Sequence, residues 1–313
     1  MTAAWLFPGQ GSQTVGMGSD VYACSAAARA VFIEADEVLG FGLRELCFNG
    51  PADTLTATEN AQPALLTTSI ALLRAAQEQA GGDLPLPAYM AGHSLGEYSA
   101  LVAAGALRLA DALRLVRRRG ELMSAAANGT MAAIMGVELA ALQAICDEAS
   151  AAGVVVVANE NSPGQLVISG ARAGVERAMA LAKERGAKRA LALNVSAAFH
   201  SPLMAEAASG LTEAVNQIER IEPPRLPVIS NVTALPLLEP AAIRAELVAQ
   251  VTAPVRWIGS VERMVADGVK EIVEIGPGTV LTGLVKRIAP GVELFNVNDG
   301  ASVDHWIARA KPA

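Results

Sequence analysis

The chain has 313 residues, which is enough for one large domain or for two unequal ones. Its composition, 52% apolar and 18% charged, is typical of an α/β enzyme, and its net charge of −7 argues against a nucleic-acid partner. The mean hydropathy of +0.36 is high. No stretch, however, approaches the roughly 18 uninterrupted apolar residues of a membrane span, so the sequence predicts no membrane association.

The first predicted element is a strand over residues 5–7, directly before Pro8. Because the N-terminus has no basic region and meets this proline early, we expect a strand there and no signal peptide. The three cysteines, Cys24, Cys47 and Cys146, are scattered along the chain. They have neither the spacing of a metal site nor that of a disulfide framework, which favours a reducing compartment. The sequence therefore predicts a cytoplasmic protein without a metal site.

Strand-like and helix-like stretches alternate over the first third of the chain. Pro63 is expected near the first turn of one helix, and Asp111 is expected to cap another that ends at Arg119. The elements expected before the second of these helices are a strand at 5–7, a turn at 9–13, the helix of Pro63 at 64–79, a strand at 88–91 and a helix at 97–104. This order predicts a parallel sheet with helices on both faces.

The middle of the chain changes to a βαββαβ order, which is that of a ferredoxin-like unit. Its expected strands and helices are, in order, 131–136, 138–151, 154–158, 165–170, 174–185 and 189–193. The α/β pattern then resumes with a strand at 227–230, a helix near 244–250 and a strand at 271–275. We therefore expect a large α/β subdomain, residues 1–126 and 197–313, that carries a small inserted subdomain, residues 127–196.

The segment Gly92-His93-Ser94-Leu95-Gly96 has the G-x-S-x-G form of a nucleophile elbow. It lies between an expected strand and an expected helix, which is the context that the motif requires. The two glycines permit a sharp turn that a Cβ would obstruct. Such a turn exposes the Ser94 hydroxyl and aims the Leu95 N–H, at the helix start, toward an oxyanion. The alternative is a glycine-rich turn with an incidental serine.

A serine nucleophile needs a base to take its proton, and the chain has only three histidines. His93 adjoins Ser94, and neighbouring side chains on a tight turn usually diverge. His305 lies in a helical C-terminal context that indicates surface packing. His200 lies where the insert returns to the large subdomain, and such a junction is a common place for a site. Elimination therefore favours His200 as the base, with a merely structural histidine as the alternative.

Two further features have more than one interpretation. The turn at 9–13 lacks the spacing of a phosphate-binding loop, so the Gln10 N–H is a candidate second donor to the oxyanion. Arg117, Arg118 and Arg119 are consecutive on a predicted helix. The helical period points Arg118 outward but does not choose between the other two. Three solvated arginines are the plain alternative.

Ordered motifs along almost the whole chain resemble those of the malonyl-CoA:acyl carrier protein transacylases of bacterial fatty acid synthesis. The matching segments are residues 7–13, 62–64, 92–97, 119–120, 161–165, 199–200 and 274–278. The G-x-S-x-G element alone fits lipases equally well, so the order and spacing of the whole set carry the resemblance. It implies a hydrolase-like large α/β subdomain with a ferredoxin-like insert. It also implies no cofactor, and malonyl-CoA and acyl carrier protein as partners.

The resemblance further implies a ping-pong reaction through a malonyl-serine intermediate. In this reaction Ser94 attacks the thioester with His200 as base. A backbone carbonyl from the residue that matches Gln250 orients the histidine. The backbone N–H groups of Gln10 and Leu95 form the oxyanion hole.

The resemblance also assigns substrate-binding residues. It selects Arg119, and not Arg117, for a bidentate contact with the malonyl carboxylate. Asn161 and Gln62 belong to matching segments and are expected at the substrate. In related polyketide acyltransferases, Ala-Phe-His before the catalytic histidine accompanies malonyl, and Ser-His accompanies methylmalonyl. Phe199 therefore favours malonyl here, although some fatty acid enzymes with Ser at this place also use malonyl.

Several alternatives share part of this pattern. Discrete polyketide acyltransferases and the malonyl-transferring subunit of malonate decarboxylase have the same motifs. A serine esterase would use water and would need no arginine for an acyl carboxylate. A non-catalytic docking module is disfavoured because Ser94 and His200 are both present. Acyl carrier proteins are acidic, so docking on a chain of net charge −7 requires a local basic patch, with Lys188, Arg189, Lys286 and Arg287 as candidates.

Overall fold

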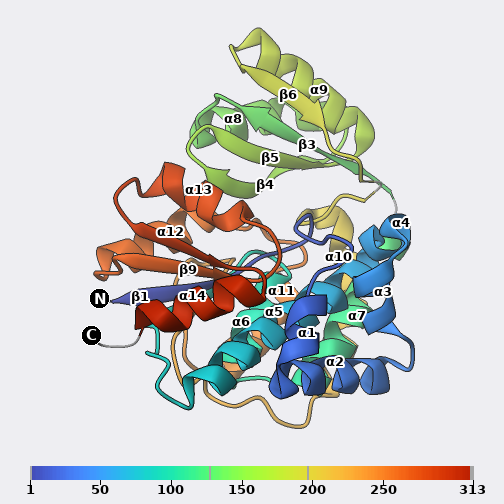
Figure 1. The fold of residues 1–313 in the computed structure, drawn as a ribbon. Helices are drawn as coiled ribbons and strands as arrows, with labels where there is room; N and C mark the ends of the chain where they lie inside the picture. Colours follow the sequence, from blue (N-terminus) through green and yellow to red (C-terminus); the bar gives the residue numbers. More distant parts are fainter. Residues whose placement is uncertain (1, 127, 196, 311–313) are drawn as a thin grey trace.

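The computed structural model describes residues 2–126, 128–195 and 197–310. These residues form a larger α/β part from both ends of the chain and a smaller part from its middle, which stands above it in Figure 1 (green to yellow). Each part has its own sheet. Ala127 and Ser196, the predicted ends of the insert, lie outside the described residues.

The larger part is organised around a six-stranded sheet with the order β10-β9-β1-β2-β7-β8. Its strands are β1 (Ala3–Phe7), β2 (Tyr89–Gly92), β7 (Val228–Ile229), β8 (Pro236–Leu237), β9 (Glu271–Ile275) and β10 (Glu293–Val297). All neighbours are parallel except β8, which pairs antiparallel with β7. Phe7 lies opposite Gly92 at the carboxyl ends of β1 and β2. The turn at 9–13 and the predicted elbow therefore lie next to each other.

Both faces of this sheet are buried, as expected for parallel strands covered by helices. Successive side chains of a strand point to opposite faces. Trp5 and Phe7 pack into the core on one face, and Ala4 and Leu6 pack into a separate core on the other. The first core includes residues of α2, α5, α6, α7, α10, α11 and α14, and the second includes residues of α12 and α13.

The helices of the larger part are α1 (Ser19–Cys24), α2 (Ala26–Leu39), α3 (Leu43–Asn49), α4 (Ala52–Thr56), α5 (Thr58–Ala80), α6 (Gly96–Ala103), α7 (Leu109–Ala125), α10 (Ala205–Asn216), α11 (Pro240–Ala249), α12 (Trp257–Ala266), α13 (Val280–Ile288) and α14 (Gly300–Ala310). A one-turn 3-10 helix covers Pro202–Met204. Within the described ranges, none of the helices combines the length and the apolar character needed to cross a membrane.

Helix α5 begins earlier than the sequence predicts. It starts at Thr58, so Pro63 lies inside it and not in its first turn. Proline has no N–H, which leaves the carbonyl oxygen of Glu59 without its helical donor. The Arg117 Nη1 atom of α7 donates to this oxygen at 3.2 Å. A contact from a neighbouring helix thus replaces the hydrogen bond that the proline removes.

Helix α7 differs from its prediction at both ends. Its N-cap is Arg108, and Asp111 lies in its first turn, where the carboxylate accepts a hydrogen bond from the Arg108 Nε atom at 2.7 Å. The prediction of Asp111 as the cap is therefore wrong. The helix also continues past Arg119 to Ala125, so Arg119 lies in its interior and not at its end.

The smaller part has the predicted βαββαβ order. Its elements are β3 (Thr130–Met135), α8 (Leu139–Ala149), β4 (Val155–Ser162), β5 (Gln165–Gly170), α9 (Arg172–Glu184) and β6 (Arg189–Ala192), with a 3-10 turn at Ser150–Ala152. The strands form an antiparallel sheet with the order β4-β5-β3-β6. Helices α8 and α9 pack on it around a core of its own that includes Ile134, Leu142 and Ile168. This confirms the predicted fold class.

The two parts are joined by contacts at one edge of the small sheet. The Glu160 N–H donates to the Val255 carbonyl at 2.9 Å, and the Val255 N–H donates to the Ala158 carbonyl at 2.8 Å. Arg287 Nη1 also donates to Gln165 Oε1 at 2.6 Å. Strand β4 thus continues its pairing with the segment before α12, and this fixes the insert over the carboxyl ends of β1 and β2.

Candidate active site

The segment between β2 and α6 forms the sharp turn that its glycines predict. Ser94 has φ 50°, in the left-handed region that few residues other than glycine adopt. A Cβ on Gly92 would lie 1.9 Å from the backbone of Gly96, and a Cβ on Gly96 would lie 2.0 Å from the Phe7 oxygen. Both positions therefore require glycine, and the turn projects Ser94 away from the sheet.

His200 lies directly against Ser94. Its Nε2 atom is 2.8 Å from Ser94 Oγ, and its Nδ1 atom is 2.8 Å from the Gln250 carbonyl oxygen and 3.2 Å from that of Ala253. Because carbonyl oxygens only accept hydrogen bonds, Nδ1 carries the proton and Nε2 is free to accept one. The pair is a dyad oriented by backbone oxygens, without a carboxylate.

The surroundings of His200 keep its imidazole neutral. Burial, together with the nearby charge of Arg119, lowers the pKa of His200 to about 3, against the opposing effect of the Gln250 carbonyl. At neutral pH the ring can therefore accept the hydroxyl proton of Ser94. The other two histidines are not placed to do so: the His93 ring nitrogen Nε2 bonds to Asn161 Oδ1 at 2.8 Å, and His305 is exposed on α14.

Arg119 reaches the same hydroxyl from α7. Its side chain is only 2% exposed, and its Nη2 atom donates to Ser94 Oγ at 3.0 Å and to Gln250 Oε1 at 2.9 Å. Nη1 donates to Gln62 Oε1 at 2.8 Å, while Nε has no partner among the described residues. The partners found are amides and a hydroxyl, not carboxylates. A buried cation of this kind is costly unless an anionic ligand joins it.

Arg117 has a different environment. Its Nε atom donates to Glu121 at 2.8 Å, and its Nη1 atom donates to Asn60 Oδ1 at 2.7 Å, on the outer side of α7. The structure therefore brings Arg119, and not Arg117, to Ser94. Gln62 is fully buried behind Arg119, where its amide also donates to the Met123 sulfur.

Gln10 and Leu95, whose backbone N–H groups are the predicted oxyanion donors, line the same cavity as Ser94. Leu95 is the N-cap of α6, and Gln10 lies in the adjacent turn after β1. Neither backbone N–H donates to another group within the described part of the chain. The Gln250 Nε2 atom donates to the Ser94 carbonyl oxygen at 3.0 Å. Because the Ser94–Leu95 peptide is planar, this bond also fixes the direction of the Leu95 N–H.

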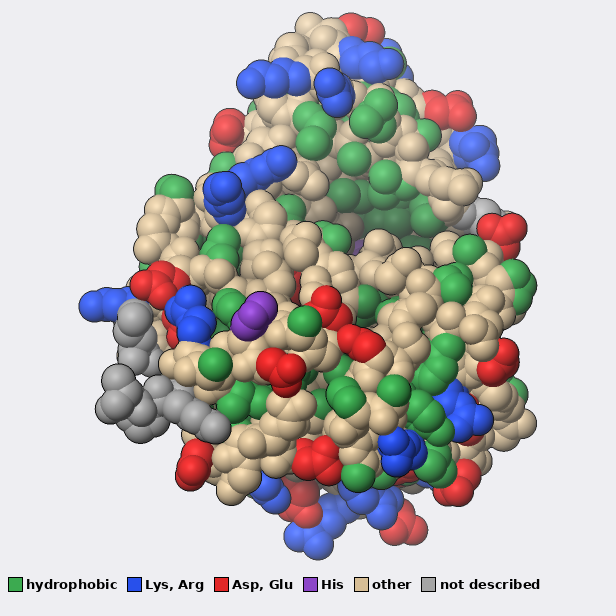
Figure 2. Space-filling view, viewed as in Figure 1, with side chains coloured by type: hydrophobic (Ala, Val, Ile, Leu, Met, Phe, Trp, Pro, Cys, Tyr) green, Lys and Arg blue, Asp and Glu red, His purple; other side chains and the backbone are tan. Residues whose placement is uncertain are grey.

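These groups open into a cavity of about 1010 Å³ between the larger part and the insert. Figure 2 shows the molecule hollowed at this level, with hydrophobic side chains inside the hollow. The lining includes the predicted residues Gln10, Ser94, Leu95, Arg119, Asn161, Phe199 and His200. Gln62 and Gln250 do not line the cavity; they contact Arg119 from behind it.

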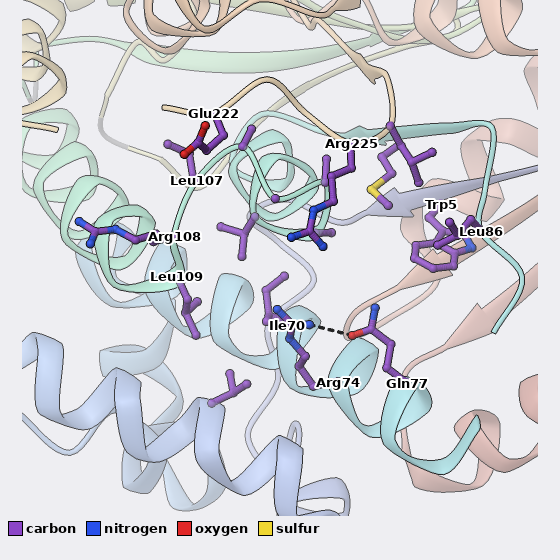
Figure 3. Close-up of a pocket in the computed structure, with 18 of the residues that line it drawn as sticks. Trp5, Ile70, Arg74, Gln77, Leu86, Leu107, Arg108, Leu109, Glu222 and Arg225 are labelled. Carbon is purple, nitrogen blue, oxygen red and sulfur yellow. Dashed lines mark hydrogen bonds between the residues drawn. The ribbon is translucent and has the colours of Figure 1, made fainter. Parts of the chain in front are cut away.

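A second cavity, of about 680 Å³, lies on the larger part and shares no lining residue with the first. Figure 3 shows Arg74, Arg108 and Arg225 around it, together with Trp5 and Leu86. Arg74 donates to Gln77 at 2.9 Å, and the three arginines are exposed. No predicted site residue is found in its wall, so the first cavity is the candidate active site.

One side chain that holds the elbow was not predicted from the sequence. Asn231, just after β7, contacts the backbone on both sides of His93. It belongs to no motif, and it is 137 residues from Ser94 in sequence. No local pattern could have identified it, since only the parallel pairing of β2 with β7 brings the two together.

Comparison with known proteins gives the family of the chain. The sequence profile of the acyl transferase domain matches residues 4–305. A malonyl CoA-acyl carrier protein transacylase of Bacillus subtilis is 49% identical over 98% of this chain and 97% of its own length.

Solved structures agree with this result. An acyl-carrier-protein S-malonyltransferase from Burkholderia pseudomallei superposes with a TM-score of 0.94 at 46% identity, covering 98% of this chain and 100% of its own. A malonyl-transacylase solved with a type II polyketide acyl-carrier protein also has a TM-score of 0.94, at 42% identity over 99% of this chain and 100% of its own. The chain belongs to the acyl transferase family and, within it, to the malonyl CoA-acyl carrier protein transacylases.

Proposed function

We propose that this protein transfers the malonyl group of malonyl-CoA to the phosphopantetheine thiol of an acyl carrier protein, supplying fatty acid synthesis. The observation that carries this proposal is the buried Arg119 guanidinium, which is 3.0 Å from the hydroxyl of Ser94 and whose other hydrogen bonds go to the amides of Gln62 and Gln250. A water-using esterase has no need for a buried cation beside its nucleophile. An acyl group that carries a carboxylate fits this site, because the carboxylate supplies the anion that the buried guanidinium lacks.

In the first half-reaction, His200 Nε2 accepts the proton of Ser94 Oγ, and Oγ attacks the thioester carbonyl carbon. The carbonyl oxygen becomes an oxyanion, and the N–H groups of Gln10 and Leu95 are placed to stabilise it. When the C–S bond breaks, the CoA sulfur takes the proton from His200. The malonyl group is then esterified to Ser94.

The second half-reaction reverses this order with a new thiol. The phosphopantetheine thiol gives its proton to His200, and its sulfur attacks the ester carbonyl. The C–O bond breaks, the proton returns from His200 to Ser94 Oγ, and the malonyl thioester leaves on the carrier. In the free enzyme Arg119 contacts the Ser94 hydroxyl. During both steps it instead holds the malonyl carboxylate through two parallel hydrogen bonds.

The test uses radiolabelled malonyl-CoA with and without carrier protein. Without carrier protein, we expect the label to be found only on the enzyme. When carrier protein is added, we expect the label to move to the carrier. Release of free malonate at the same rate with or without carrier would instead support an esterase.

A polyketide carrier is a second candidate acceptor. The relative solved with a type II polyketide acyl-carrier protein favours it, at 42% identity over almost the whole chain. Transfer rates to a fatty acid carrier and to a polyketide carrier, measured at equal concentration, separate the two. A higher kcat/KM for the polyketide carrier would assign this protein to that pathway.

The acidic carrier is expected to dock on basic side chains near the cavity mouth. Lys286 and Arg287 lie exposed in the last turn of α13. Lys188 and Arg189 are also exposed; Lys188 directly precedes β6, and Arg189 is its first residue. Other residues of both elements line the cavity. Charge reversal of these four to Glu is expected to raise the KM for carrier protein about tenfold, and to leave the KM for malonyl-CoA nearly unchanged.

The matched control reverses a charge far from this mouth. Arg74, exposed beside the second cavity (Figure 3), replaced by Glu should change neither KM. An equal rise in both KM values for the four-residue variant would argue against a docking role.

Phe199 is expected to set the choice between malonyl and methylmalonyl. Its half-buried ring lines the active-site cavity, where it can occupy the space that an α-methyl group needs. A methyl group is worth about 1–3 kcal/mol of discrimination, so Phe199→Ser should improve methylmalonyl-CoA relative to malonyl-CoA by about tenfold or more. Competition between the two donors measures this ratio. Phe295→Ser is the control, because Phe295 is a half-buried ring outside the cavity. An unchanged ratio of methylmalonyl to malonyl transfer in Phe199→Ser would overturn the assignment.

We also propose a cytoplasmic location and a division into two subdomains. Cys24, Cys47 and Cys146 are all unpaired, which fits a reducing compartment. Two separate sheets, and a core of the insert that is distinct from both cores of the larger part, support a large subdomain of residues 1–126 and 197–313 and an insert of residues 127–196.

A further inference from the structure

The Asn231 side chain contacts the backbone of the elbow. Its Oδ1 atom accepts a hydrogen bond from the Ser94 N–H at 2.7 Å, and its Nδ2 atom donates to the Gly92 carbonyl oxygen at 2.7 Å. Asn231 is fully buried and is not part of the cavity wall. It therefore touches the backbone that carries the nucleophile and not the space that the substrate would occupy.

The backbone at this point needs such support. Ser94 has φ 50°, in the left-handed region, where a residue other than glycine is strained. The two bonds from Asn231 hold the peptide groups that lead into Ser94. Gln250 holds the peptide group that follows it. Without the Asn231 side chain, the peptide groups before Ser94 lose their restraint and only the one after it remains held.

Asn231 is itself fixed by its own neighbours. Its backbone N–H donates to Glu97 Oε2 at 2.7 Å, and its carbonyl oxygen accepts from the Arg256 N–H at 2.9 Å. The next N–H, that of Val232, donates to Glu246 Oε1 at 3.0 Å. The backbone N–H, the backbone carbonyl and both ends of the side-chain amide of Asn231 thus each have a partner, and these contacts hold the side chain against the elbow.

We propose that Asn231 is a positioning residue that holds Ser94 in the orientation for attack, acting only through the backbone of the elbow. This rests on the proposed role of Ser94 as nucleophile. Loss of the side chain is expected to affect the reactivity of Ser94 toward any acylating agent. It should not affect the binding of malonyl-CoA, because Arg119 and the cavity wall stay in place.

The first variant is Asn231→Ala. Because a displacement of about 1 Å at a reacting atom can cost 10²-fold, we expect kcat to fall about 10²-fold with the KM for malonyl-CoA unchanged within about twofold. The rate of Ser94 modification by phenylmethylsulfonyl fluoride should fall in parallel. This reagent carries no carboxylate and so does not depend on Arg119. Modification of wild-type Ser94 by the reagent checks the nucleophile separately from the role of Asn231.

The second variant, Asn231→Asp, gives a pH-dependent signature. Its ionised carboxylate would accept from the Ser94 N–H but repel the Gly92 oxygen, whereas its protonated form restores the donor. Burial would raise the pKa of the new carboxyl, as it already raises the pKa values of the neighbouring Glu97 on α6 and Glu246 on α11, while the charge of Arg119 opposes this shift. Activity relative to wild type should therefore rise as the pH falls from about 8 to 5. Wild-type His200, whose pKa is lowered to about 3, stays neutral over this range.

The control is Asn298→Asp, which changes an amide that donates to the Gly278 carbonyl away from the elbow. Its activity relative to wild type should not depend on pH.

If Asn231→Ala does not fold, the pH dependence of Asn231→Asp tests the proposal by itself. Two results would overturn the proposal: a kcat of Asn231→Ala within about twofold of wild type, or a flat ratio for Asn231→Asp while wild-type Ser94 is still modified. Failure of wild-type Ser94 to react would instead refute the proposed nucleophile.

Discussion

Ser94→Ala is expected to abolish the malonyl adduct on the enzyme and to lower malonyl transfer by several orders of magnitude. The reason is geometric: Ser94 Oγ is 2.8 Å from His200 Nε2, and it stands on the turn that projects it into the cavity. Intact-mass measurement after treatment with malonyl-CoA detects the adduct directly. His200→Ala should slow the formation of the same adduct, since the proton of Ser94 then has no acceptor.

Ser99→Ala is the matched control for this substitution. Ser99 lies on α6, the helix that follows the elbow, and its buried hydroxyl does not line the cavity. The Ser99→Ala variant should be malonylated at Ser94 as fast as the wild type. The cavity wall also contains the hydroxyls of Ser12 and Ser124. A malonyl adduct that persists in Ser94→Ala, mapped to either of them, would contradict the assignment of Ser94.

The elbow could be predicted from sequence because its requirements are local. Two glycines, a serine between them and the flanking strand and helix all lie within a short stretch, and the steric demand on Gly92 and Gly96 is set by that stretch and by β1. His200 could be named because the chain offers only three histidines. The βαββαβ insert could be predicted because each of its strands and helices has a distinct apolar pattern.

The remaining features depend on contacts between distant segments. Arg117 and Arg119 are two positions apart on one helix, and the helical period alone cannot tell which of them faces the elbow. Packing of α7 against α5 decides it, and the same packing supplies the donor that lets α5 begin before Pro63. Asn231 is the extreme case, since nothing near it in sequence indicates that its amide meets Ser94.

Arg119→Ala is expected to reverse the acyl preference of the enzyme. The guanidinium is 2% exposed, and removing one partner of a buried charge pair costs about 3–5 kcal/mol, so malonyl transfer should fall at least 10²- to 10³-fold. Acetyl-CoA brings no carboxylate, and in the wild type it would leave the buried charge unpaired. The variant should therefore keep or gain acetyl transfer. Measurement of kcat/KM for both donors gives their ratio, which does not depend on the fraction of folded enzyme.

Arg117→Ala provides the matched control, because it removes the same group from the same helix. Arg117 bonds to Glu121, Asn60 and the Glu59 carbonyl, so its loss can lower the free energy of unfolding without touching Ser94. The malonyl-to-acetyl ratio of this variant should equal that of the wild type. If instead Arg117→Ala lost malonyl transfer and Arg119→Ala kept it, then the buried guanidinium beside Ser94 would not be the group that recognises the carboxylate. Retention of the wild-type ratio by both variants would mean that neither arginine selects the acyl group.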